Sequence, residues 1–232
     1  MDIELLTRSR SESNQQYAYR VLKHNILTLK LVPSQILEER LLSEVLNMSR
    51  TPIREALINL KQEYLVDIYP QKKTRVSLID LALVQDGQFV RTTIEPFILE
   101  QLIAQQNAST FFKMRENLSA QKCAIEDENE YLHFLDLDNA FHKIMYVAIN
   151  KEKIWDCIST ISAQYNRMRY FDVVLGTGRL SRIYEQHLEL YNIIISQNST
   201  LADVREHITD HLTGYQSMLP QLLEDYKDYF LH

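Results

Sequence analysis

Three residue types are scarce in this chain of 232 residues, which has two cysteines, four glycines and five prolines. Two isolated thiols cannot build a disulfide framework, so Cys123 and Cys157 favour a reducing compartment, and we expect a cytoplasmic protein. The small number of glycines and prolines leaves few tight turns and predicts long helices.

Long apolar runs are also absent. No stretch approaches the roughly 20 apolar residues that are needed to cross a bilayer. The opening sequence MDIELLTRSRSESNQQ lacks the apolar segment of a signal peptide. We therefore expect no membrane partner.

Charge is divided unevenly along the chain, although its net value is only −6. Residues 1–79 hold 12 Lys and Arg against 9 Asp and Glu, a balance of +3, and the remainder has a balance of −9. A mildly basic N-terminal segment followed by an acidic remainder indicates that the N-terminal segment binds a polyanion.

The most distinctive stretch is SRTPIREAL, from Ser49 to Leu57. Ser49 or Thr51 can cap a helix by accepting backbone N–H bonds that lack partners. Pro52 is compatible with a first helical turn, where its missing N–H costs nothing. The stretch therefore predicts the start of a helix.

This helix has one apolar and one polar face. Apolar residues recur 3, 4 and 7 positions after Ile53, which predicts a buried face. Arg50, Thr51 and Arg54 are left exposed near the N-terminus, where cationic side chains suit the phosphates and guanine edges of a major groove. The alternative is an ordinary surface helix with two arginines.

The flanking sequence favours the DNA-binding interpretation. A predicted helix ends just before the short turn that leads into SRTPIREAL, and the helix of the motif follows that turn, as in a helix-turn-helix. Two segments of alternating apolar and polar residues come next, and the stretch between them is basic, as at the tip of a β-hairpin. The expected helices and strands cover residues 14–29, 38–46, 49–63, 65–69 and 74–77. This order is that of a winged helix-turn-helix with a small β-hairpin wing.

The same residues resemble the GntR superfamily of transcriptional repressors. The resemblance covers roughly residues 14–77 and is carried by Glu39-Arg40-(x2)-Ser43-Glu44, by SRTPIREAL, by Leu60 and by Leu65-Val66. It implies DNA contacts from Arg40, Ser49, Arg50, Thr51, Arg54, Lys72 and Lys73. The chain departs from the family in two places where glycine is usual, the segment 31–35 and Lys73.

The rest of the chain is expected to be an all-α bundle. The predicted helices cover residues 80–105, 109–127, 129–149, 151–175, 179–197 and 200–230. Six such helices after a winged helix resemble the ligand-sensing domain of the FadR/FCD subgroup. We thus expect a disordered lead-in at 1–13, a DNA-binding domain at 14–79 and a helical effector-binding and dimerisation domain at 80–232.

A metal site is predicted inside this bundle. Asp138 and His142 lie four residues apart on one apolar helical face, and His187 and His211 each interrupt an apolar face of another helix. Converging imidazoles and a carboxylate suit a first-row divalent ion such as Zn²⁺, Ni²⁺ or Mn²⁺. The alternative is a set of separate core histidines; His207 competes with His211, but its neighbours are polar.

The FCD resemblance favours the metal, because that subgroup has Asp-(x2)-Phe-His on one helix and a histidine on each of the last two. It also implies that the metal holds a small carboxylate effector. Arg91 matches the arginine of the first sensing helix and could bind a carboxylate with two hydrogen bonds, or simply pair with Glu95. Arg169 is a further candidate for contacting the effector.

These features predict a dimeric DNA-binding regulator and no enzyme, because no general base is visible in the sequence beside the metal ligands. Pairing two heads on an inverted-repeat operator doubles the phosphate contacts, and the effector would shift the dimer between arrangements. Two alternatives are a metal-dependent hydrolase fused to a DNA-binding head and a winged-helix regulator whose sensor has no ligand.

Overall fold

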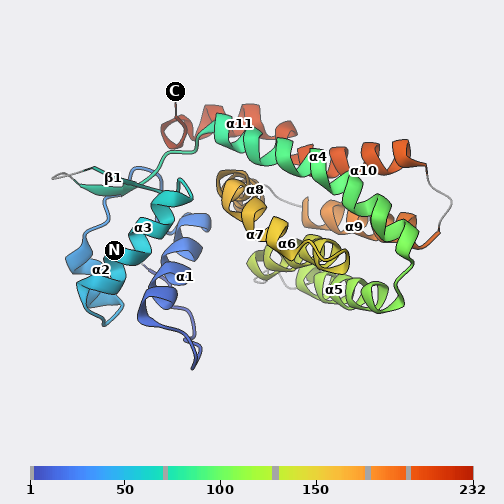
Figure 1. Cartoon of the computed structure of the whole chain (residues 1–232). Helices are drawn as coiled ribbons and strands as arrows, with labels where there is room; N and C mark the ends of the chain where they lie inside the picture. Colours follow the sequence, from blue (N-terminus) through green and yellow to red (C-terminus); the bar gives the residue numbers. More distant parts are fainter. Residues whose placement is uncertain (1–2, 70–72, 127–130, 176–178, 197–199, 232) are drawn as a thin grey trace. The chain divides into compact units, whose positions relative to one another are not determined.

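The computed structural model describes residues 3–69, 73–126, 131–175, 179–196 and 200–231 (Figure 1). Helices dominate it, with one two-stranded antiparallel sheet. The chain forms two compact units: residues 1–85, 160–171 and 220–232 make the first, and residues 86–159 and 172–219 make the second. The mainly α fold class is confirmed. Within the described residues, no helix has the length and apolar character that crossing a membrane requires.

The first unit contains three helices and the hairpin. Helix α1 packs against α3, and α3 also contacts α2 and β1. These elements are α1 (Asn14–Leu27), α2 (Glu39–Val45), α3 (Arg50–Gln62), β1 (Val66–Ile68) and β2 (Thr74–Val76). The strands pair in register as Val66 with Val76 and Ile68 with Thr74. The predicted winged helix-turn-helix is therefore present.

The core of this unit follows the apolar spacing of the sequence. Ile53, Ala56, Leu57 and Leu60 of α3 are all buried, and they join apolar residues of α1 and the strands in one cluster. Burying such side chains contributes about 1.5–3 kcal/mol each. The apolar face thus fixes which side of α3 is left for solvent.

Residues 3–12 precede α1 without helix or strand. Glu4 N–H donates to Asn25 Oδ1 at 2.8 Å, and Arg20 donates to the Glu12 carboxylate at 2.8 Å. Ile3 and Leu6 pack against the core of the first unit.

The segment where the related family usually has glycine contains Ser34 with φ of 66°. This left-handed conformation is costly for residues with a Cβ atom. Ser34 N–H donates to the Val76 carbonyl at 3.0 Å, so a hydrogen bond to β2 supports the conformation without glycine.

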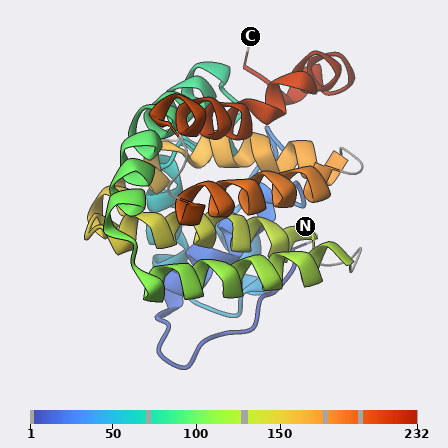
Figure 2. The same ribbon diagram turned by 90° about the vertical axis from the view of Figure 1, so that its right-hand side faces the viewer.

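The second unit is a bundle in which α5, α6 and α9 run side by side (Figure 2). Helix α9 also contacts α10. The helices that follow the wing are α4 (Leu81–Gln105), α5 (Ala108–Glu126), α6 (Tyr131–Ala148), α7 (Glu152–Ile161), α8 (Ala163–Leu175), α9 (Arg179–Ser196) and α10 (Leu201–Thr213). Helix α4 remains continuous although it contains Pro96.

Two predicted helices are broken, and these predictions were wrong. The segment 151–175 divides at Ser162 into α7 and α8. The boundary between the two compact units falls between residues 159 and 160, within α7. The segment 200–230 divides into α10, the 3-10 turn η1 (Gly214–Ser217), α11 (Leu219–Asp225) and the 3-10 turn η2 (Lys227–Tyr229). Arg179 donates to the Gly214 carbonyl, and Pro220 lacks the N–H that would continue a helix through this point.

Candidate functional site

The N-terminal end of α3 presents the polar residues that the sequence singled out. Ser49 occupies the N-cap position with an extended backbone, but its side chain makes no capping hydrogen bond. Arg50, Thr51 and Arg54 are exposed. Ser49 and the exposed side chains of Arg50 and Arg54 thus lie at a helix N-terminus, the geometry that suits phosphate and base edges.

Two of the candidate DNA-contacting arginines, Arg54 and Arg40, are paired with glutamates. Arg54 donates Nε and Nη2 to the two carboxylate oxygens of Glu39 on α2, at 3.0 and 2.7 Å. Arg40 donates to Glu44 at 2.8 Å, and both of these side chains are exposed. The Arg54 fork is therefore oriented before any ligand arrives, which lowers the entropy cost of using it.

The hairpin offers fewer described cations. Lys73 is exposed, whereas Lys72 lies outside the described residues. Arg75 of β2 donates to Asp67 at 3.2 Å and to the Tyr69 hydroxyl at 2.9 Å, so this arginine serves the hairpin itself.

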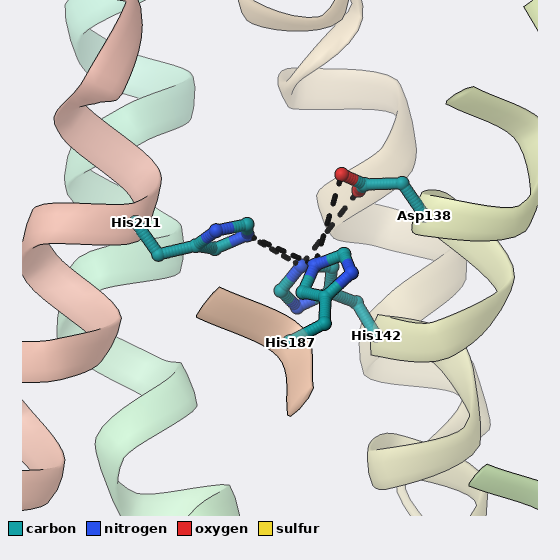
Figure 3. Close-up of side chains that lie close together, drawn as sticks. All are labelled: Asp138, His142, His187 and His211. Carbon is teal, nitrogen blue, oxygen red and sulfur yellow. Dashed lines mark hydrogen bonds and ion pairs between the residues drawn. The ribbon is translucent and has the colours of Figure 1, made fainter. Parts of the chain in front are cut away.

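In the second unit, Asp138, His142, His187 and His211 lie together, with one ligand-type atom of each within 4.8 Å of the others (Figure 3). The first three are fully buried. Asp138 and His142 leave the same face of α6, His187 comes from α9 and His211 from α10. Nε2 of His211 lies 3.1 Å from Nε2 of His142 and 3.2 Å from Nε2 of His187.

The carboxylate completes this cluster. Asp138 Oδ1 lies 3.8 Å from Nε2 of His142, and Oδ2 lies 3.7 Å from Nε2 of His187. Two imidazole nitrogens that share one Zn²⁺ are about 2.9–3.3 Å apart for angles between a right angle and a tetrahedral one. The spacing and the mixture of nitrogen and oxygen donors fit a divalent ion.

The outer nitrogen of each ring faces an oxygen. Nδ1 of His142 lies 2.9 Å from Glu95 Oε2. Nδ1 of His187 lies 2.8 Å from Gln121 Oε1, and Nδ1 of His211 lies 3.2 Å from Gln186 Oε1. Metal-bound histidines characteristically donate their second nitrogen in this way.

Glu95 is charged although it is fully buried. Burial by itself would raise the pKa of Glu95, but neighbouring Arg91 and His142 lower that pKa to about 2. Burial lowers the pKa of His142, despite the Glu95 carboxylate beside it. At neutral pH an ionised Glu95 therefore lies 2.9 Å from Nδ1 of a neutral His142 ring, which favours a proton on that nitrogen.

Arg91 is 1% exposed and donates Nε to Glu95 Oε1 at 2.6 Å. The expected alternative, an ion pair with Glu95, is thus present. The same carboxylate also meets His142, so Arg91 lies one residue away from the cluster. The Arg91 guanidinium lies 5.8 Å from the centre of the Trp155 ring, which itself lies 5.3 Å from that of Tyr146.

The other candidates lie elsewhere. Arg169 belongs to the first compact unit and donates to Asn166 at 3.2 Å. His207 was expected to face water, but it donates Nε2 to the Gln186 carbonyl at 2.7 Å and is only partly exposed. Arg167, which was considered beside Arg169, is buried and donates to the Ser77 carbonyl at 2.8 Å within the first unit.

Sequence reasoning missed the residues behind the histidines. Glu95 was considered only as a partner for Arg91, and Gln121 and Gln186 were not considered. One signal was available for Gln121: it falls on the apolar stripe of α5 that also contains Met114 and Leu118, all buried. A glutamine in such a stripe needs a polar partner inside the core.

The winged helix, with exposed cationic side chains at the start of α3, defines a DNA-binding regulator, and the His-Asp cluster is a candidate metal site in the second unit. Residues 14–76 match the family of bacterial regulatory proteins of the GntR family, and residues 88–214 match the FCD domain. The chain belongs to the GntR family of transcriptional regulators and carries an FCD domain.

Known relatives agree with this assignment. The chain is 30% identical to the HTH-type transcriptional repressor RspR of Escherichia coli over 232 residues, with 99% of each chain covered. It is 29% identical to an HTH-type transcriptional regulator of Streptomyces ambofaciens over 197 residues, which cover 85% of this chain and 82% of the relative. Among solved structures, Escherichia coli McbR/YncC shares the fold, with a TM-score of 0.73 and 17% identity over 90% of this chain and 98% of that one.

Proposed function

We propose that this regulator is a dimeric repressor whose DNA binding is controlled by a small carboxylate held at a divalent metal ion. Residues 14–79 form the DNA-binding domain and residues 80–232 the effector-binding and dimerisation domain. The metal ligands are Asp138, His142, His187 and His211. The similarity to a relative named as a repressor supports the sign of the regulation.

The observation that carries the metal proposal is that three histidine nitrogens and the Asp138 carboxylate, all of them potential metal ligands, converge on one point. Each outer nitrogen of the three rings faces a side-chain oxygen, which favours a proton on Nδ1. A neutral ring protonated there presents its Nε2 lone pair to the centre. Three lone pairs and the Asp138 carboxylate repel one another in a buried site unless a cation lies between them.

A bound ion supplies a Lewis-acidic centre that an effector carboxylate can join. Arg91 lies next to this centre, paired with the Glu95 carboxylate that also meets His142. Its guanidinium suits a second carboxylate oxygen of the effector. Zn²⁺, Ni²⁺ and Mn²⁺ all accept such a donor set.

On DNA, the exposed start of α3 enters the major groove and the wing contacts the backbone. The proposed contact residues are Arg40, Ser49, Arg50, Thr51, Arg54, Lys72 and Lys73. Two copies related by a two-fold axis read an inverted repeat, since one head alone makes few phosphate contacts.

The test begins with selection of duplexes from a random pool and measurement of Zn²⁺, Ni²⁺ and Mn²⁺ content by elemental analysis. The purified chain is expected to retain one divalent ion and to select an inverted repeat. Replacing His142 and His187 by alanine should abolish metal retention. A panel of small mono- and dicarboxylates should change the operator affinity of the wild type only.

His133→Ala is the matched control, because His133 is an exposed histidine of the same helix α6. It should keep both metal and response. Carboxylate-dependent operator binding in the double alanine variant would contradict the metal-held effector, and a wild type without preference for any duplex would contradict the regulator.

A further inference from the structure

The amide of Gln121 has a defined direction. Asn117 Nδ2 donates to the backbone carbonyl of Leu137 at 3.0 Å. A carbonyl only accepts, so the Asn117 oxygen must face the other way, where Gln121 Nε2 donates to it at 2.7 Å. Gln121 Oε1 is thereby turned to Nδ1 of His187, 2.8 Å away.

This series of hydrogen bonds begins next to the proposed metal site and ends at one of its ligands. Leu137 precedes Asp138 on α6, Asn117 and Gln121 lie one turn apart on α5, and His187 is on α9. Gln121 is fully buried, so water does not compete for its amide. Reversing the direction would place two acceptors 3.0 Å apart at Leu137, which is unfavourable.

A second, shorter chain reaches His211. Gln186 Nε2 donates to Asp210 Oδ2 at 2.7 Å. A carboxylate only accepts, so Gln186 Oε1 is turned to Nδ1 of His211, 3.2 Å away. Asp210 is 62% exposed in its side chain, so solvent weakens this chain relative to the first.

We infer that Gln121 and Gln186 are positioning residues that fix His187 and His211 as tautomers protonated on Nδ1, with Asn117 and Asp210 setting the direction of the two amides. The inference rests on the proposed metal site and says which residues prepare it. Glu95 does the same directly for His142, since its carboxylate has no donor to offer. With Nδ1 protonated in all three rings, each Nε2 faces the position proposed for the ion.

The first experiment records the tautomers in the metal-free protein by long-range ¹H–¹⁵N correlation of the histidine rings. In the wild type, Nδ1 of His187 and His211 should carry the proton. In Gln121→Leu the proton of His187 should redistribute toward Nε2, while His211 keeps its state. A wild type in which Nδ1 of either ring lacks the proton overturns the inference, whether or not any metal binds.

The second experiment measures Zn²⁺ affinity by competition with a chromophoric chelator. Gln121→Leu should weaken binding about 10–100-fold, the usual range for losing a residue that orients a ligand. Gln186→Leu should have a smaller effect, because its chain is exposed. Gln121→Glu keeps an acceptor for His187 and should bind Zn²⁺ more tightly than Gln121→Leu.

Asn117→Leu tests the orientation of the Gln121 amide separately from the contact between Gln121 and His187. It leaves Gln121 beside His187 but removes the group that orients its amide, so the affinity should fall between the wild type and Gln121→Leu. Because Asn117 is partly exposed, this variant also serves if Gln121→Leu does not fold.

Gln164→Leu is the matched control, since Gln164 is a buried glutamine of the first unit. It should leave Zn²⁺ affinity and all three tautomers unchanged. Loss of Zn²⁺ in the His142 and His187 variants, together with unchanged affinity and tautomer in Gln121→Leu, contradicts this inference alone. Absence of Zn²⁺ binding in the wild type contradicts the proposed function, and the tautomer measurement still decides the inference.

Discussion

Glu95 joins two other buried side chains in the polar core of the second unit. One carboxylate oxygen pairs with Arg91 and the other with His142. All three side chains are at most 1% exposed, so the charges of Arg91 and Glu95 depend on each other. A buried charge that loses its partner is costly, because neither water nor another group replaces it.

Arg91→Met therefore tests the pair. It should destabilise the chain by about 3–5 kcal/mol, because Glu95 keeps its charge without the guanidinium or must take up a proton. Chemical denaturation in the presence of a chelator measures this loss. The double variant Arg91→Met/Glu95→Gln should recover much of the stability, and equal losses in the single and double variants would rule out the explanation.

Arg54 is one of the residues proposed to contact DNA, and its substitution tests that contact. Arg54→Ala should weaken operator binding about tenfold or more, since a bidentate guanidinium contact is lost. Arg54→Lys keeps the charge but not the fork and should relax the base preference. Titration of selected and scrambled duplexes at several salt concentrations measures both effects, with Arg75→Ala as a control in the hairpin.

Single residues were predictable where their spacing carried the signal. Asp138 and His142 share an apolar face four residues apart, and His187 and His211 sit in similar stripes, so their meeting in one core could be anticipated. Gln121 and Gln186 could not be assigned in the same way, because their roles depend on hydrogen bonds between helices far apart in sequence. The burial of Arg167 likewise follows from a contact with Ser77 that no local pattern reports.

Among the elements, α1 and α3 are joined by a polar cluster as well as by apolar packing. Lys23 of α1 donates to Glu63 at 2.6 Å and to the Tyr19 hydroxyl at 2.9 Å, and Tyr19 also donates to Glu63. Burial by itself would lower the pKa of Lys23, but Glu63 and Tyr19 hold that pKa above its usual value. Burial raises the pKa of Tyr19.

This cluster predicts an alkaline loss of stability. A lysine whose pKa is raised on folding stabilises the fold fully below its unfolded pKa of about 10.4, and the contribution disappears as the pH rises through the folded value. The raised pKa of Tyr19 acts in the same direction above a pH of about 10. Urea denaturation between pH 8 and 11 should show a shallower decline for Lys23→Met than for the wild type; parallel curves would refute the prediction.

Element boundaries followed local signals only in part. The helix of Asn14–Leu27 begins at a capping box formed by Ser13 and Gln16, and α3 begins at Arg50, with Ser49 at the N-cap position that the sequence offered for it. The divisions at Ser162 and Gly214 were missed, because apolar periodicity continues across both points. At Gly214 the backbone carbonyl accepts a hydrogen bond from Arg179 of α9, a contact between helices that no local pattern reports.

For the molecule as a whole, a metal that joins α6, α9 and α10 should raise thermal stability. An ion at a hundredfold excess over its dissociation constant contributes about 2.7 kcal/mol. In a chain of this length that corresponds to roughly 5–11 °C in Tm.

Differential scanning calorimetry of metal-loaded and chelated protein measures the shift. The alanine variants of His142 and His187 should show none, and the exposed His133→Ala variant should match the wild type. An unchanged Tm in the loaded wild type would argue against a structural link between the three helices.

The ligand set of this cluster has one further consequence, which concerns oxidants. Its donors are imidazoles and a carboxylate, whereas the exposed thiols of Cys123 and Cys157 lie outside it. Sites built from thiolates release their ion when peroxide oxidises the sulfur. A site without sulfur keeps its ion under the same attack, so peroxide stress should leave this regulator loaded and its response to the effector intact.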